Sequence, residues 1–139
     1  MAAELMSFGM VFTLFRGAEK QIKRAVSAEF RIAFGVMTSW LSAVNAIRNI
    51  CAHHGRLWNR VLGLKPLIPD KDSKWHTPIE VPNDRMFAVL TLLKYVLTIV
   101  APQSKWQNRL ESLMEKYPDV PLRDMGFPQN WKDCPIWEH

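Results

Sequence analysis

Apolar residues recur with helical spacing along most of the chain, and this pattern predicts its secondary structure. Helices are expected at about residues 2–15, 18–30, 36–57, 84–101 and 104–117. Gly35 is a plausible break before the third helix, Asn83 or Asp84 a cap for the fourth, and Ser104 a cap for the fifth. No convincing strand pattern occurs between them. The sequence therefore predicts an all-α bundle of about five helices.

The fourth predicted helix is apolar on nearly all sides, which is typical of a helix enclosed by other elements. After Pro118 the chain is rich in proline and tryptophan. We expect this tail to be irregular and to pack back on the helices through Phe127, Trp131 and Trp137.

A long irregular connection is predicted between residues 59 and 81, where prolines are frequent. Loops of this length in compact proteins are usually functional or disordered. One interpretation is a basic and aromatic lip for RNA, formed by Lys65, Lys71, Lys74, Trp75 and His76. The other is a solvated loop that Trp75 pins to the core.

The third predicted helix is two-faced and carries the most informative residues of the chain. With about 100° per residue, a polar stripe centred on Asn45 has Arg48 and His53 on its flanks. His54 and Cys51 fall on the apolar side and are expected to be buried. This geometry favours His53 over His54 for chemistry, unless the helix ends or tightens near Gly55 and rotates both rings.

An arginine and a histidine are the minimum set for cleaving RNA without a metal. Arg48 is a permanent cation that can bind phosphate oxygens, and His53 can exchange a proton near neutral pH. Cys51, His53 and His54 lack the usual zinc spacing, and we predict neither a metal nor a cofactor. Arg56 is expected to bind phosphate together with Arg60, four residues later; the alternative is that both cap the helix C-terminus.

Composition sets the limits on these interpretations. A chain of 139 residues with 48% hydrophobic and 22% charged residues predicts one folded domain over residues 1–139. Its net charge of +5 favours an anionic partner. Two cysteines, no secretory signal and no apolar segment long enough to span a membrane predict a cytoplasmic protein.

Three segments closely resemble the Abi-like family of abortive-infection phage-resistance proteins. The central one is the most specific, and the other two lie near the ends of the chain. They are Ser39-Trp40-Leu41 through Ile47-Arg48-Asn49-Ile50-Cys51-Ala52-His53-His54-Gly55-Arg56-Leu57-Trp58-Asn59-Arg60, upstream Glu4-Leu5-Met6-Ser7-Phe8-Gly9, and downstream Met125-Gly126-Phe127-Pro128-Gln129-Asn130-Trp131.

That family resembles the HEPN group of helical-bundle ribonucleases, whose signature is an arginine followed four to six residues later by histidine. The resemblance implies a HEPN-like fold with Arg48 and His53 as catalytic residues, Asn49 at the polar position and His54 as a possible second histidine. It also implies a metal-independent endoribonuclease of a phage-defence or toxin system. Family members usually have a further N-terminal region, so the partners to expect include that region or a cognate antitoxin.

The expected reaction needs a base, an acid and cations at phosphorus, and yields a 2′,3′-cyclic phosphate and a 5′-hydroxyl. A homodimer with the polar face of the motif helix at its interface supplies two copies of each group. Small polar residues on that face (Ser42, Asn45, Asn49) allow close approach.

Two other hypotheses stay open at this stage. One is a catalytically silent RNA-binding or antitoxin-sensing module, consistent with the basic charge alone. The other is a protein-interaction module in which Arg48 and His53 are interface residues.

Overall fold

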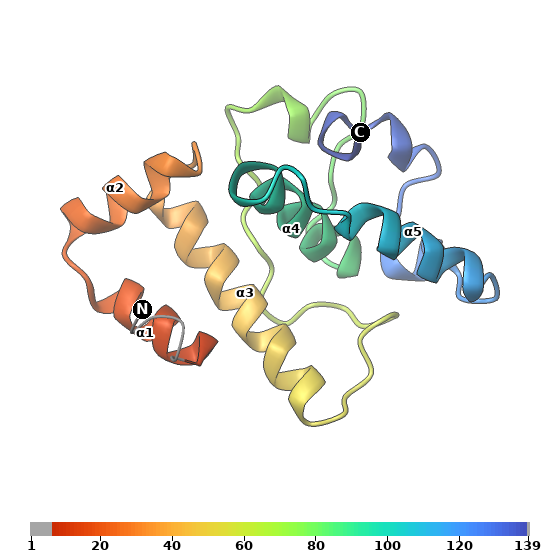
Figure 1. The fold of residues 1–139 in the computed structure, drawn as a ribbon, viewed down its shortest axis with the longest axis horizontal. Helices are drawn as coiled ribbons and strands as arrows, with labels where there is room; N and C mark the ends of the chain where they lie inside the picture. Colours follow the sequence, from red (N-terminus) through yellow and green to blue (C-terminus); the bar gives the residue numbers. More distant parts are fainter. Residues whose placement is uncertain (1–6, 139) are drawn as a thin grey trace. The chain divides into compact units, whose positions relative to one another are not determined.

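The protein is all-α, as the sequence predicts. A computed structural model describes residues 7–138, so the first five residues of the first predicted helix (2–6) lie outside the described part. Within it there is no strand, and five α-helices follow one another along the chain (Figure 1). They are α1 (Phe8–Gly17), α2 (Lys20–Glu29), α3 (Phe34–Ala52), α4 (Met86–Val100) and α5 (Trp106–Lys116).

The chain divides into two compact units. The first comprises Met1–Leu57 and Gly63–Pro69, and the second comprises Trp58–Leu62 and Asp70–His139. Their charges differ sharply. The first unit carries eight basic residues (Lys and Arg) and three acidic ones (Asp and Glu). The second carries ten basic and ten acidic residues, so the net charge of +5 belongs to the first unit. The expectation of a single domain, like that of a HEPN-like arrangement, stays a prediction.

In the first unit, α1 and α2 pack against α3 (Figure 1). Ser7 caps α1 by accepting a hydrogen bond from the backbone N–H of Met10 at 3.3 Å. The core between the helices is made by a few large side chains and one alanine, namely Phe12, Met37, Trp40 and Ala43.

The segment Gly63–Pro69 belongs to this unit because α3 binds its backbone. The indole N–H of Trp40 donates to the carbonyl of Leu67 at 2.8 Å, and the N–H of Leu67 donates to the hydroxyl of Ser39 at 2.6 Å. Pro66 is buried beside them. Residues that lie about 28 positions apart in the sequence are thereby fixed to one another, which no helical pattern could have indicated.

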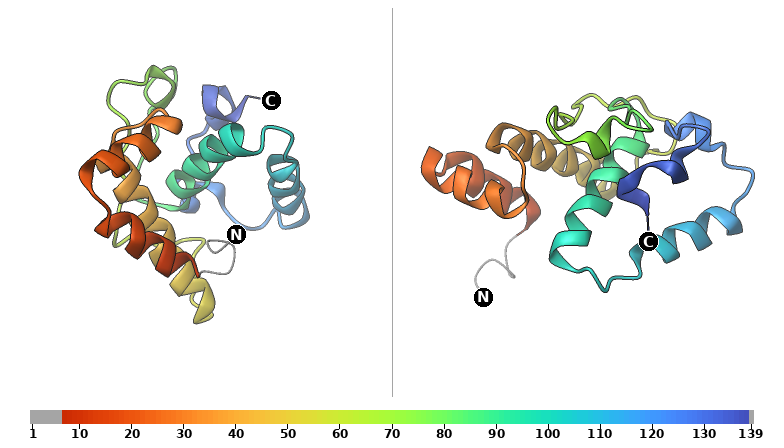
Figure 2. Two further views of the ribbon diagram at one scale, coloured as in Figure 1. Left: turned by 60° about the vertical axis from the view of Figure 1, so that its left-hand side comes forward. Right: turned by 90° about the horizontal axis from the view of Figure 1, so that it is seen from above.

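The second unit is built on an aromatic cluster that the C-terminal tail brings to α4. Phe87 packs against Phe127 with ring centroids 4.7 Å apart, and Trp137 lies 6.0 Å away, stacked on the same ring. The indole N–H of Trp137 donates to the hydroxyl of Thr91 at 3.0 Å. The tail runs beside α4 in both views of Figure 2. The predicted packing of Phe127, Trp131 and Trp137 is confirmed.

Helix α4 begins one to two residues later than predicted. Its N-cap position is Arg85, without a side-chain cap, and the carbonyl of Asp84 accepts a hydrogen bond from the N–H of Leu62 instead. Ser104, by contrast, does accept a hydrogen bond from the N–H of Trp106 at the start of α5, at 3.2 Å. The N-cap position of α5 is nevertheless Lys105, without a side-chain cap, so neither predicted residue is the N-cap of its helix.

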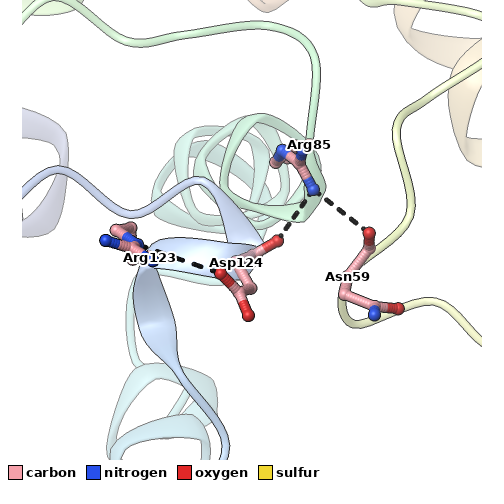
Figure 3. Close-up of polar contacts among 4 residues, drawn as sticks. All are labelled: Asn59, Arg85, Arg123 and Asp124. Carbon is pink, nitrogen blue, oxygen red and sulfur yellow. Dashed lines mark hydrogen bonds and ion pairs between the residues drawn. The ribbon is translucent and has the colours of Figure 1, made fainter.

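Arg85 joins two distant backbone segments within the second unit (Figure 3). Its Nη1 donates to the carbonyl of Asn59 at 3.1 Å and to that of Asp124 at 3.2 Å. Gly126 has a φ of 85°, and a Cβ there would lie 2.8 Å from the Cβ of Arg85. The glycine of the downstream resembling segment is therefore required by this close approach and by its left-handed backbone.

The connection over residues 59–81 is irregular apart from a short 3₁₀ turn, as predicted. Trp75 is completely buried, with its ring 5.6 Å from that of Tyr95. It therefore cannot stack on an RNA base, and its part in an RNA-binding lip is wrong. The second interpretation, a loop pinned to the core by Trp75, is confirmed for the part of the loop in the second unit, where Lys71 and Lys74 are exposed. Lys65, in the first unit, is exposed as well.

Over residues 7–138, no single helix is long and apolar enough to cross a membrane, and only the bent pair α2 and α3 passes the length and composition test when counted together.

Candidate functional site at the end of α3

Helix α3 ends at Ala52 in a Schellman motif. His53 is the C-cap residue, and His54 follows in the left-handed region with a φ of 56°. The N–H of Gly55 donates to the carbonyl of Ile50 at 2.8 Å, and the N–H of His54 donates to the carbonyl of Cys51 at 3.1 Å. These are the two bonds that define the motif, in which the left-handed position is usually glycine.

This ending corrects the predicted limits of the helix. The polar and apolar stripes do not continue to Leu57, and Gly35, expected as a break, lies inside α3 as its second residue. His54 and Cys51, expected on the buried side, are both exposed. For His54 the physical reason is that its left-handed turn carries the chain away from the helix axis. Cys51 lies before this turn, in the last turn of α3, and is exposed there. Gly55 was the available signal, since glycine is the residue that most often marks a helix end.

The four residues of the predicted catalytic set are all exposed, at the C-terminal end of α3. Arg48 and Asn49 lie in the last two turns of the helix, and His53 and His54 lie just beyond it. The carbonyl of Asn49 accepts a hydrogen bond from the backbone N–H of His53 at 3.1 Å, so this pair is linked through the main chain. Between residues 7 and 138, no hydrogen bond joins the side chains of these four residues.

The exposure of both histidines changes what one chain can offer. Helix periodicity left His53 as the only imidazole on the polar face, whereas the structure presents His53 and His54 at the same helix end. One guanidinium and two imidazoles, all open to solvent, can between them bind a phosphate and both remove and donate a proton. Which histidine does so stays a prediction, and the helix-face argument no longer distinguishes them.

The middle of the predicted polar face is not free, because α1 covers it. The side-chain oxygen of Asn45 is buried, and a Cβ on Gly9 of α1 would lie 3.5 Å from it. Within the described chain this oxygen has no hydrogen-bond partner. Close approach of a second copy at Asn45 is therefore blocked, and the accessible part of the polar face is the end that carries Arg48 and Asn49.

Arg56 and Arg60 are exposed, but not as a pair on one helix face. Both lie beyond the end of α3, Arg56 in the first unit and Arg60 in the second. The helical spacing that grouped them is therefore wrong. In the part of the chain that the structure covers, Arg56 makes no hydrogen bond to the last carbonyls of α3, so it does not cap the helix. Phosphate binding by either arginine stays a prediction.

Among residues 7–138, no three His, Cys, Asp or Glu side chains are grouped closely enough to hold a metal ion. In the second unit, burial raises the pKa of the Cys134 thiol. That group is far along the chain from the motif and is not a candidate for its chemistry.

Comparison with known proteins gives one match. No curated protein and no solved structure matches the chain. A family model, described as Abi-like protein, matches residues 1–59, a segment that contains α1, α2, α3 and the exposed motif. The N-terminal segment that carries the candidate site is thus similar to the Abi-like family.

Proposed function

We propose that this protein is a metal-independent endoribonuclease of a phage-defence system, with its active site at the exposed C-terminal end of α3. The observation that carries the proposal is the joint exposure of Arg48, Asn49, His53 and His54 within the segment that matches the Abi-like family. Such a protein acts in the cytoplasm, where phage transcripts are made.

The proposed reaction is an internal transfer at phosphorus. One imidazole removes the proton of a 2′-hydroxyl, the resulting oxygen bonds to the adjacent phosphorus, and the bond to the 5′-oxygen breaks. A second imidazole donates a proton to the departing 5′-oxygen. Arg48 binds the non-bridging oxygens and stabilises the added negative charge of the transition state. The side chain of Asn49, one helical turn before His53, orients the imidazole. The products are a 2′,3′-cyclic phosphate and a 5′-hydroxyl.

We further propose a two-fold homodimer that brings two such helix ends together and doubles the number of guanidinium groups at the phosphate. Because α1 covers Asn45, the contact is expected at the Arg48 and Asn49 end rather than at the centre of α3. Light scattering at micromolar concentration should report about twice the chain mass of 16.1 kDa. A monomer at every concentration would remove the shared site, while cleavage by one chain could still use both histidines.

The test of the activity is cleavage of labelled RNA in EDTA. Wild type should cut RNA but not DNA of the same sequence, because DNA lacks the attacking 2′-hydroxyl. The new 5′ ends should accept a phosphate from polynucleotide kinase without prior dephosphorylation. Arg48→Ala should lose the activity, and Arg109→Ala, which removes an exposed arginine of α5, should keep it. Equal cleavage by both variants would exclude Arg48 from the reaction and point to a contaminating nuclease.

A second candidate is an RNA-binding module without catalysis. It is favoured by the concentration of the whole net charge in the first unit, which supports RNA binding but requires no proton transfer. Salt-sensitive binding of RNA that stays intact during long incubation would select this function over the first.

A further inference from the structure

The first unit contains a cluster of cations outside the motif, on one edge of α2. Lys20 and Arg24 lie four residues apart on this helix, and both are exposed. The Nζ of Lys20 is 5.7 Å from the ring centroid of Phe34, and the Cζ of Arg24 is 5.6 Å from the same centroid. One aromatic ring at the start of α3 therefore holds two positive groups on a common surface, which we name the α2 basic edge (Lys20 and Arg24).

This arrangement is unfavourable for the isolated protein. Like charges at this spacing on a helix repel each other, and cations in the first turn oppose the helix dipole. No carboxylate compensates for this, because within residues 7–138 neither Lys20 nor Arg24 forms an ion pair, and Glu19 makes no side-chain cap. The cation–π contacts fix the stems and leave the polar hydrogens of both groups available to an external anion.

We infer that the α2 basic edge is a second contact surface for the RNA backbone, separate from the helix end that carries Arg48. The inference rests on the proposed RNA substrate. It follows from the charge distribution: the first unit holds all of the net positive charge, and its cations at this edge lack acidic partners. A chain of phosphates is the partner that fits several unpaired cations spread over one unit.

An anionic membrane surface fits the same charges less well. A helix that lies on a membrane needs its apolar stripe between its cations, so that both meet the lipid together. On α2 the large exposed apolar residues are Ile22 and Val26. At about 100° per residue, each lies about 160° around the helix from the cation two positions before it. The apolar and basic edges of α2 therefore face different directions and cannot contact one flat surface.

The experiment measures binding of a fluorescein-labelled, fully 2′-O-methylated RNA 12-mer to the full chain by anisotropy, over a series of KCl concentrations. This probe lacks the free 2′-hydroxyl and cannot be cleaved by the proposed reaction. Binding is therefore measured independently of catalysis. If the wild-type protein binds this probe but cleaves no unmodified RNA, the proposed function is overturned, while the inference about the α2 basic edge still holds.

The variant Lys20→Gln with Arg24→Gln should reduce the slope of log K against log salt by about 1.4, which corresponds to about 0.7 for each of two lost phosphate contacts on a single strand. The matched control is Lys116→Gln with Lys132→Gln. These two cations also lie over aromatic rings, at 5.4 and 5.5 Å, but in the neutral second unit. The control should keep the wild-type slope. A charge-preserving exchange, Lys20→Arg with Arg24→Lys, should keep it as well.

Three results would overturn the inference. The first is an unchanged slope in the α2 variant, and the second is an equal decrease in the control, which would indicate an effect of total charge alone. The third comes from sedimentation with phosphatidylserine vesicles. If wild type binds the vesicles, and the α2 variant loses that binding but keeps the RNA slope, the edge serves a membrane surface instead.

Discussion

The backbone N–H of Gly55 donates to the carbonyl oxygen of Ile50 at 2.8 Å, and this bond determines where the candidate site lies. It closes α3 at Ala52 and places His53 and His54 beyond the helix rather than on two of its faces. The two residues are also in close steric contact, since a Cβ on Gly55 would lie 2.5 Å from the Cγ2 of Ile50. The helix end therefore depends on the absence of a side chain at position 55.

Gly55→Ala should destabilise the protein by about 1–3 kcal/mol, the usual cost of forcing an extra methyl group into a packed site. Urea unfolding measures this. In a chain that carries Gly55→Ala, the further change Ile50→Ala removes the Cγ2 atom that the new methyl group would meet. The double variant should therefore lose less stability than the sum of the two single variants.

Gly35→Ala is the matched control for that substitution. Gly35 lies in the first turn of α3, and a Cβ there would meet nothing within 4 Å. Alanine should therefore be neutral or stabilise by up to about 1 kcal/mol through its helix propensity. A similar loss for Gly35→Ala and Gly55→Ala would show that the contact with Ile50 is not the cause.

His54→Gly should stabilise the protein by about 1 kcal/mol. A left-handed conformation costs an L-residue about 1–2 kcal/mol relative to glycine, and glycine loses part of this gain through its freer unfolded chain. His54 is exposed, so no packing is lost. Thermal unfolding of His54→Gly and His53→Gly distinguishes the two positions, because His53 has an ordinary φ of −97° and should gain nothing. Destabilisation at position 54 would mean that the imidazole makes a stabilising contact.

The fold class was predictable because helical spacing of apolar residues is a local property of the sequence. The five helices were found in this way, whereas the packing of the tail tryptophans was expected from the proline- and tryptophan-rich composition after Pro118. The helix end at the motif was missed because it depends on a left-handed histidine, which the stripe pattern cannot indicate. The cover of Asn45 by α1 and the bond from Trp40 to Leu67 were missed because they are tertiary contacts. The exposure of Arg48 and Asn49 was predicted correctly, because helical periodicity alone places both side chains on the polar face of α3.

Arg85→Ala should destabilise the second unit by about 1.5–3 kcal/mol, because it removes two hydrogen bonds from a charged donor to backbone carbonyls. The neighbouring Arg123 is the control. Its side chain is 94% exposed and lies 3.9 Å from the carboxylate of Asp124 (Figure 3). Ion pairs of this kind contribute little, so Arg123→Ala should change the free energy of unfolding by less than about 0.5 kcal/mol. Equal losses in urea unfolding would assign the effect to the arginine charge rather than to the two carbonyl contacts.

The two thiols should react at very different rates. Cys51 is exposed near the end of α3, whereas Cys134 is fully buried, and burial raises its pKa and so lowers its thiolate content. A thiol reagent at pH 8 should label one cysteine in the folded protein and two in urea. Cys51→Ser should leave almost no rapid reaction. The raised pKa also predicts that Cys134 contributes stability below its ordinary value of 9.0, and that this contribution is lost as the pH rises further.

The histidines themselves provide the sharpest test of the proposed site. Because both are exposed, His53→Ala and His54→Ala should each change the free energy of unfolding by less than about 0.5 kcal/mol, so that any loss of activity is chemical. His53→Ala should abolish RNA cleavage, because the proposed reaction takes a proton-transfer group from the imidazole at this position. If one chain supplies both acid and base, His54→Ala should also lower the rate by about 100-fold or more. Full activity in His54→Ala would instead require the second imidazole to come from another copy of the chain. In that case the two imidazoles are the His53 side chains of two copies, and a mixed dimer of Arg48→Ala with His53→Ala holds only one of them. Mixing these two inactive proteins should then not restore cleavage.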